Sequence, residues 1–194
     1  TVVLEKADVE FMRQSILHLE SENASLSAAV YQIELWHPTL WLNQCIEASN
    51  KIVIEMLRML IAMNKNPPPE DYLRSTVISA QRHIRSLRGR ITIGFKKADE
   101  LVDLAKNDPR ILGRTSIATM EKVADTYVDS FKNESILADV LEELLDYQSK
   151  ALNEGNIQSD VVKKEFDLFE LKFQMVGQKR AELHRELLYL FEYQ

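Results

Sequence analysis

Side chains whose types and spacing could support chemistry are sparse in this 194-residue sequence. A di-iron site in a helical bundle would need two Glu-x-x-His pairs on facing helices. Glu34 and His37 have that spacing, but His37 directly precedes a proline and the sequence holds no second pair. The other histidines, His18, His83 and His184, lie in separate segments at positions that the pattern predicts to be exposed. We therefore expect no metal and no other cofactor.

Motifs for nucleophilic catalysis and phosphate binding are also missing. The sequence has no Gly-x-Ser-x-Gly elbow, and its five glycines are isolated, so none forms a glycine-rich turn ahead of a helix. Cys45 is the only cysteine, which excludes a disulfide within the chain and a zinc site built from several thiolates. These observations favour a protein that is not an enzyme, and we predict a reducing, cytoplasmic location.

One basic stretch stands out in a chain whose formal net charge is −6, from 24 Lys and Arg against 30 Asp and Glu. Arg82, Arg85 and Arg88 recur every three residues and so share one side of a helix, and Arg90 follows them. Two interpretations remain open: a docking face for an acidic partner or a phosphate, or a face paired with the acidic residues between 134 and 146. The negative net charge makes nucleic acid an unexpected partner and disfavours an anionic membrane surface.

Two tryptophans and one arginine are further candidates for contacts. Trp36 and Trp41 flank Pro38, where we expect them to cover the joint between two helices. The alternative is that they form a hot spot for a partner protein. Arg180 lies in an otherwise apolar seam, where it can extend to solvent or pair with a glutamate.

All these residues belong to predicted long helices, because apolar residues follow alternating steps of four and three. The clearest seam comprises Leu73, Val77, Ala80, Ile84, Leu87, Ile91, Gly94, Ala98, Leu101 and Ala105. Breaks are predicted at Pro38, at residues 66–69, near Pro109 and at Gly155. The fourth helix carries an irregularity at residues 132–134, which we interpret as a kink or a stutter.

The first predicted helix, residues 2–36, has its own seam. Its two heptad rows comprise Val9, Met12, Ile16, Leu19, Asn23, Leu26, Val30 and Ile33. β-Branched residues in one row and mainly Leu or Met in the other favour two parallel strands, with Asn23 fixing the register. Residues 19–26 resemble a leucine-zipper segment, but no Lys/Arg-rich DNA-contacting region precedes them. We therefore predict a dimerisation element.

The sequence predicts an all-α protein, a long antiparallel bundle of four to five helices with an N-terminal coiled-coil helix. Residues 1–36 form the dimerising helix and residues 39–194 an antiparallel four-helix bundle; if the first helix does not dimerise, it closes a five-helix monomer. The expected function is a non-enzymatic interaction or scaffold module that homodimerises and presents helical faces to a protein partner.

Two alternative functions remain open. If the breaks at Pro38 and Pro109 are kinks, the chain becomes three long bent antiparallel rods. That outline resembles the dimeric BAR modules that bend membranes, which would imply a membrane-surface function and would need a basic concave face. The helical pattern equally suits a secreted effector or toxin fragment.

Overall fold

The protein is helical in its computed structural model, which describes residues 5–27, 37–65, 67–108, 116–154 and 159–192. Its helices are α1 (Lys6–Ser27), α2 (His37–Met63), α3 (Glu70–Asp99), α4 (Leu101–Asn107), α6 (Ile117–Glu154) and α7 (Ser159–Glu192). No strand occurs in these ranges. The predicted all-α helical bundle is confirmed.

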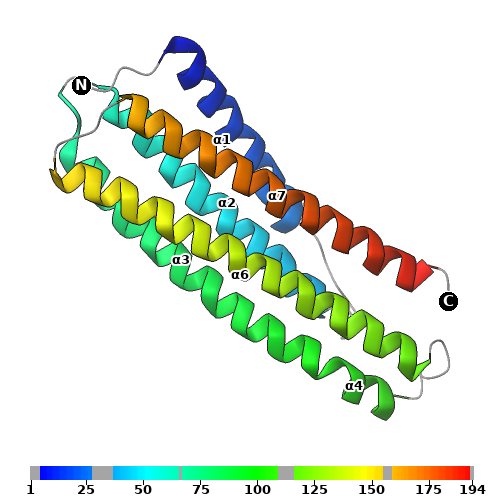
Figure 1. Ribbon diagram of the computed structural model, residues 1–194. Helices are drawn as coiled ribbons and strands as arrows, with labels where there is room; N and C mark the ends of the chain where they lie inside the picture. Colours follow the sequence, from blue (N-terminus) through cyan, green and yellow to red (C-terminus); the bar gives the residue numbers. More distant parts are fainter. Residues whose placement is uncertain (1–4, 28–36, 66, 109–115, 155–158, 193–194) are drawn as a thin grey trace.

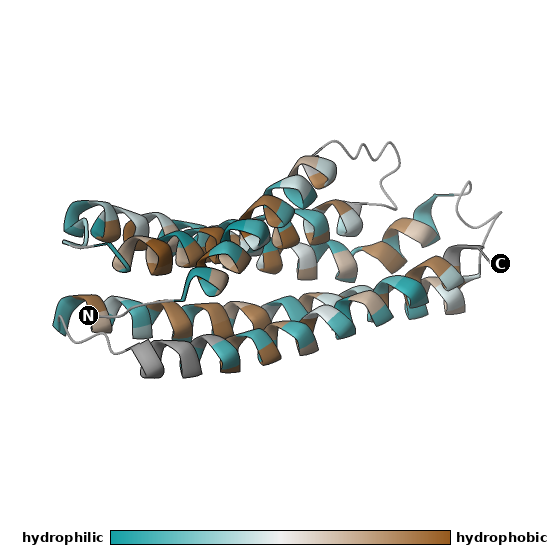
Figure 2. Ribbon diagram, turned by 90° about the horizontal axis from the view of Figure 1, so that it is seen from above, coloured by the Kyte–Doolittle hydropathy of each residue, from teal (hydrophilic) through white to brown (hydrophobic). Residues whose placement is uncertain are grey.

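Successive long helices run in opposite directions along the molecule (Figure 1). Three of them, α2, α3 and α6, pack against one another and form the centre of the bundle. The helix α1 packs on α2, while α7 packs on α6. Hydrophobic and hydrophilic residues alternate along each helix (Figure 2), as expected where one face of a helix is buried. The flanking helices α1 and α7 thus pack on two different members of the central group, α2 and α6.

The seam predicted for the third helix is buried along its whole length, from Leu73 in α3 to Ala105 in α4. Gly94 in this seam faces the ring of Phe131 in α6, and a Cβ atom added to it would lie 2.1 Å from a ring carbon. Glycine is therefore required at this position for the Phe131 ring to enter the space between α3 and α6. The side chain of Phe131 is fully buried there.

The prolines at 67–69 separate α2 from α3 as predicted, because α2 ends at Met63 and α3 begins at Glu70. The third predicted helix is divided near residue 100, which the sequence pattern did not predict. Glu100 keeps helical dihedral angles (φ −73°, ψ −14°), and its N–H still donates to Lys96 O at 3.0 Å. The division is thus a local change between α3 and α4 and not a loop.

No break in α6 occurs at residues 132–134, where the sequence was interpreted as a kink or a stutter, since α6 runs without interruption from Ile117 to Glu154. Its buried residues keep alternating steps of four and three once a charged residue is counted among them: Met120, Ala124, Tyr127, Phe131, Glu134, Ala138, Leu141, Leu145 and Gln148. The irregularity in the sequence is therefore a glutamate in a core position and not a break in the helix.

The helix α1 contributes to the same hydrophobic core as α2. Met12, Ile16 and Leu19 from the predicted dimer seam are buried in this core, and Val9 packs against it. The remaining seam positions at 30 and 33, and the predicted domain boundary at residue 36, lie outside the described residues. The division into a coiled coil and a separate bundle stays a prediction, as does dimerisation through this helix.

Candidate binding groove between α1 and α7

A buried ion pair joins α6 to α7. Arg180 donates from Nε to Glu134 Oε1 at 2.7 Å and from Nη2 to Oε2 at 2.8 Å, so the two groups form a bidentate pair. The side chain of Glu134 is 1% exposed and that of Arg180 is 21% exposed. Burial opposes the charge on Arg180, but the carboxylate of Glu134 outweighs this effect and raises the pKa of the guanidinium above its ordinary value. Of the two interpretations of Arg180, pairing with a glutamate is confirmed.

A second polar cluster joins α1 to α2. Asn50 is 1% exposed, and its Nδ2 donates to Glu22 Oε1 at 2.9 Å and to Asn23 Oδ1 at 3.0 Å. The Nδ2 of Asn23 donates to the backbone oxygen of Glu47 at 3.3 Å. The Asn23 side chain, predicted to fix the register of a dimer, thus fixes the position of α1 on α2 within one chain.

A cavity of about 570 Å³ lies between α1, α2, α6 and α7, and we call it the α1–α7 groove. Its wall includes the apolar side chains of Leu19, Leu26, Leu42, Phe173, Leu187 and Leu188. Its polar lining includes Asn50, Ser130, Asn133, Glu134 and Arg180. Gly177 also lines it, and a Cβ atom added at that position would meet no atom within 4 Å. The groove thus combines leucine-rich walls with a few fixed polar groups.

The predicted basic stretch divides into paired and exposed members. Arg88 donates from Nη2 to Asp139 Oδ1 at 2.9 Å and also to Glu142, both on α6. The hydrogen bond to Glu142, which has the larger effect, and that to Asp139 raise the pKa of the Arg88 guanidinium above its ordinary value. Arg82 and Arg85 are exposed on α3. Pairing with the acidic residues of the neighbouring helix is therefore confirmed for Arg88, and the docking interpretation is left to Arg82 and Arg85.

The remaining predicted contact residues lie at the edge of the core. Arg90 donates from Nη1 to Gln44 Oε1 on α2 at 3.0 Å and from Nε to Ser86 Oγ at 3.0 Å. Trp41 is half-buried and packs against the core. Trp36 lies outside the described residues. The prediction that both tryptophans cover the joint near Pro38 is therefore open.

The other titratable groups that the sequence offered are three histidines and one cysteine. His18 and His184 are exposed, as predicted, and line the groove. His83 was also predicted to be exposed, but it is half-buried. Burial lowers the pKa of the His83 imidazole. Cys45 is free and fully buried, and burial raises the pKa of its thiol. Over the part of the chain that the structure describes, no group of three or more His, Cys, Asp or Glu residues could hold a metal ion.

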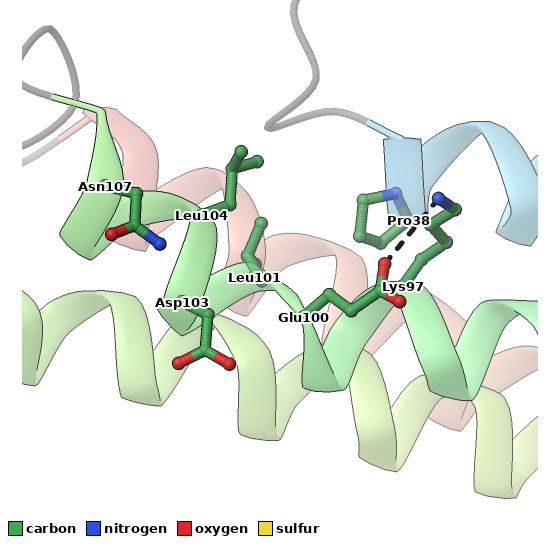
Figure 3. Close-up of a pocket in the computed structure, with 7 residues that line it drawn as sticks. All are labelled: Pro38, Lys97, Glu100, Leu101, Asp103, Leu104 and Asn107. Carbon is green, nitrogen blue, oxygen red and sulfur yellow. Dashed lines mark ion pairs between the residues drawn. The ribbon is translucent and has the colours of Figure 1, made fainter.

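A second, smaller cavity of about 350 Å³ lies where the start of α2 faces the junction of α3 and α4 (Figure 3). Its lining comprises Pro38, Lys97, Glu100, Leu101, Asp103, Leu104 and Asn107. Lys97 Nζ lies 3.7 Å from Glu100 Oε2, so these two charges satisfy each other. This cavity lacks the leucine-rich wall of the α1–α7 groove, which therefore remains the stronger candidate.

Comparison with known proteins does not assign the chain to a family. No protein-family model, no curated protein and no solved structure matches it. Among the described helices, none is both long enough and apolar enough to cross a membrane. Function is therefore inferred from the geometry of the groove.

The sequence pattern missed the central residues of this groove. Glu134 was considered only among the acidic residues that could pair with the basic stretch, because its charge made the seam of α6 look broken. Counting the alternating steps through this position would have placed it in the core, opposite the predicted seam position Arg180. Asn50 and Asn133 gave no such signal, because they are polar residues adjacent to seam positions and only the packing of α1 and α7 buries them.

Proposed function

We propose that this chain is a non-enzymatic binding module whose binding site is the α1–α7 groove. The observation that carries the proposal is the combination of apolar walls with a buried, bidentate Glu134–Arg180 pair in one cavity of about 570 Å³. Ligand sites typically have volumes of roughly 300–1,000 Å³, mostly apolar linings and a few fixed polar groups, and they occur between the helices of bundles.

Two observations support a function in binding without catalysis. Glu134 and Arg180 bind each other through two hydrogen bonds, so neither is poised to exchange a proton with a substrate. Cys45 is buried and its thiol pKa is raised, which keeps it protonated and a weak nucleophile. A free, reduced cysteine also suits the cytoplasm, where we place the module.

A titration with Nile red, an uncharged dye that fluoresces in apolar surroundings, tests this proposal. Wild-type protein should bind the dye, whereas Gly177→Leu should weaken binding by about tenfold or more because its side chain occupies the groove. Gly89→Leu is the matched control, since Gly89 is an exposed helical glycine with equally open space. Equal binding by both variants, or no binding by the wild type, would contradict the proposal.

A second function, a homodimeric scaffold for a protein partner, is supported by the outer surface of α7. Leu168, Leu171 and Met175 are 48%, 56% and 63% exposed, and their spacing places them on one side of the helix. They lie apart from Phe169 and Val176, which face the core. An exposed apolar stripe of this kind is typical of an interface between proteins. We propose that a second copy of the chain covers it.

The membrane-surface alternative has less support from the charges. Arg88 lies between two carboxylates of α6, and Lys96 Nζ lies 3.9 Å from Glu100 Oε1. Arg82 and Arg85 remain as exposed cations of the basic stretch. Two exposed arginines on a chain of net charge −6 form a weak attraction for anionic lipid.

A further inference from the structure

We propose that the α1–α7 groove binds an uncharged amphiphile, a molecule with an apolar body and a hydroxyl or amide head that both donates and accepts hydrogen bonds. This inference rests on the proposed function and adds the chemical class of the ligand. It depends on the hydrogen-bonding capacity of the groove and on its charge.

The polar groups of the groove include hydrogen-bond donors beside several acceptors. Arg180 uses two N–H groups for Glu134, and a guanidinium carries five, so its further N–H groups can donate to a ligand. The acceptors are the side-chain oxygens of Asn50, Asn133 and Ser130. Each of these residues already donates to the protein, and each oxygen retains acceptor capacity.

All three residues line the groove. The one buried side-chain polar atom without a partner among the described residues is Gln148 Oε1, which is not part of the groove lining. No polar atom of the groove is therefore sealed away from both protein and solvent. A head group that donates to Asn50 or Asn133 and accepts from Arg180 would match the groove, and a hydroxyl or an amide does both.

The charges of the groove disfavour an ionic head. Glu134 and Arg180 neutralise each other at 2.7 Å, and Glu22 accepts a hydrogen bond from Asn50. A carboxylate beside Arg180 would also meet the carboxylates of Glu134 and Glu22. An ammonium group would meet the guanidinium of Arg180, whose charge already interacts with the carboxylates of Glu134 and Glu22. An ion of either sign would thus lose its hydration beside a like charge.

The apolar body would lie along the wall formed by Leu19, Leu42 and Leu187, which come from three different helices. Each methylene group transferred from water to such a wall adds to the affinity. The wall therefore supplies affinity, while the head group supplies discrimination between ligands.

Isothermal titration calorimetry with octanol, octanoate and octylammonium tests the inference, because the three probes share one tail and differ in the head. At pH 7, octanol should bind the full chain at least about tenfold more tightly than either ion, since each ion would lose its hydration beside a like charge. Gly177→Leu and Ala181→Leu, two substitutions in the groove lining, should each weaken octanol binding by about tenfold or more. Gly89→Leu should bind octanol like the wild type.

Circular dichroism of each variant confirms folding before the titration, and Ala181→Leu serves if Gly177→Leu does not fold. Tighter binding of octanoate or octylammonium, still lost in the groove variants, would overturn the uncharged-head inference and leave the groove as the binding site. Absence of octanol binding would also overturn the inference. Octanol binding that neither groove variant weakens would contradict both the inference and the proposed function.

Discussion

The ion pair between Glu134 and Arg180 shows how one residue of each helix can define a site. Each side chain occupies a core position of its own helix, where an apolar residue would be ordinary. Burying either charge alone would cost several kcal/mol, and the bidentate contact offsets that cost. The pair therefore contributes more to the position of α7 on α6 than to net stability.

Single and double substitutions test whether the two side chains are coupled in the free energy of unfolding. Glu134→Leu and Arg180→Leu should each lower the free energy of unfolding by about 3–5 kcal/mol, because each leaves one buried charge without its partner. The double variant should be more stable than either single variant. Urea denaturation measures all three, and additive losses in the double variant would show that the two side chains are not coupled.

Cys45 should make the free energy of unfolding depend on pH. Its thiol pKa is raised by burial in the folded chain, so the folded state retains its proton above the ordinary thiol pKa of about 8.5, where the unfolded state releases it. Its contribution to stability is therefore complete below that pH and is lost as pH rises further.

Urea denaturation between pH 7 and pH 10 tests this sign. The wild type should lose stability above about pH 8.5 more steeply than Cys45→Ala, by up to about 1.4 kcal/mol per pH unit. Parallel pH profiles for the two proteins would show that the thiol ionises equally in both states.

Among the helices, the contact between α3 and α6 is fixed by Gly94 and Phe131. Gly94→Ala would place a methyl group 2.1 Å from a carbon of the buried Phe131 ring. We expect it to destabilise the protein by about 1–3 kcal/mol, as overpacking does in well-packed cores. Gly89→Ala, on an exposed face of the same helix, should stabilise by up to about 1 kcal/mol.

Thermal melts of the two alanine variants compare the same chemical change on one helix. An unchanged or raised melting temperature for Gly94→Ala would mean that Gly94 and the Phe131 ring lie farther apart than in the structure.

The sequence predicts some elements of this architecture better than others. The seam from Leu73 to Ala105 predicts α3 and α4 as buried helices, because every step places an apolar residue on one face. At Glu134 the alternating steps indicate a core position, but local periodicity cannot indicate that a charge on α7 balances it. It also could not assign the α1 seam to a partner chain or to α2, because both bury the same residues. The groove depends on such long-range packing and had no local signal.

The whole molecule is a central group of three helices with α1 and α7 on two of its members. This arrangement places the apolar walls of α1 and α7 on either side of polar residues from α2 and α6. It also leaves the stripe of Leu168, Leu171 and Met175 facing outward. One inner and one outer surface of α7 are thus available for binding.

The oligomeric state tests the proposed role of the outer surface of α7. If a second copy covers the α7 stripe, multi-angle light scattering of the full chain should give the mass of a dimer, and Leu171→Glu with Met175→Glu should shift it to a monomer. If the dimer forms through α1 instead, as its heptad seam predicts, that double variant should leave the dimer mass unchanged. A monomeric wild type would contradict both forms of the dimer.

The groove itself is tested most directly by intermolecular nuclear Overhauser effects between octanol and a methyl-labelled sample of the protein. The proposal predicts contacts from the octyl chain to methyl groups of Leu19, Leu42 and Leu187, which lie on α1, α2 and α7 and meet only at the groove. Contacts confined to Leu168 and Leu171 on the outer surface of α7 would contradict it.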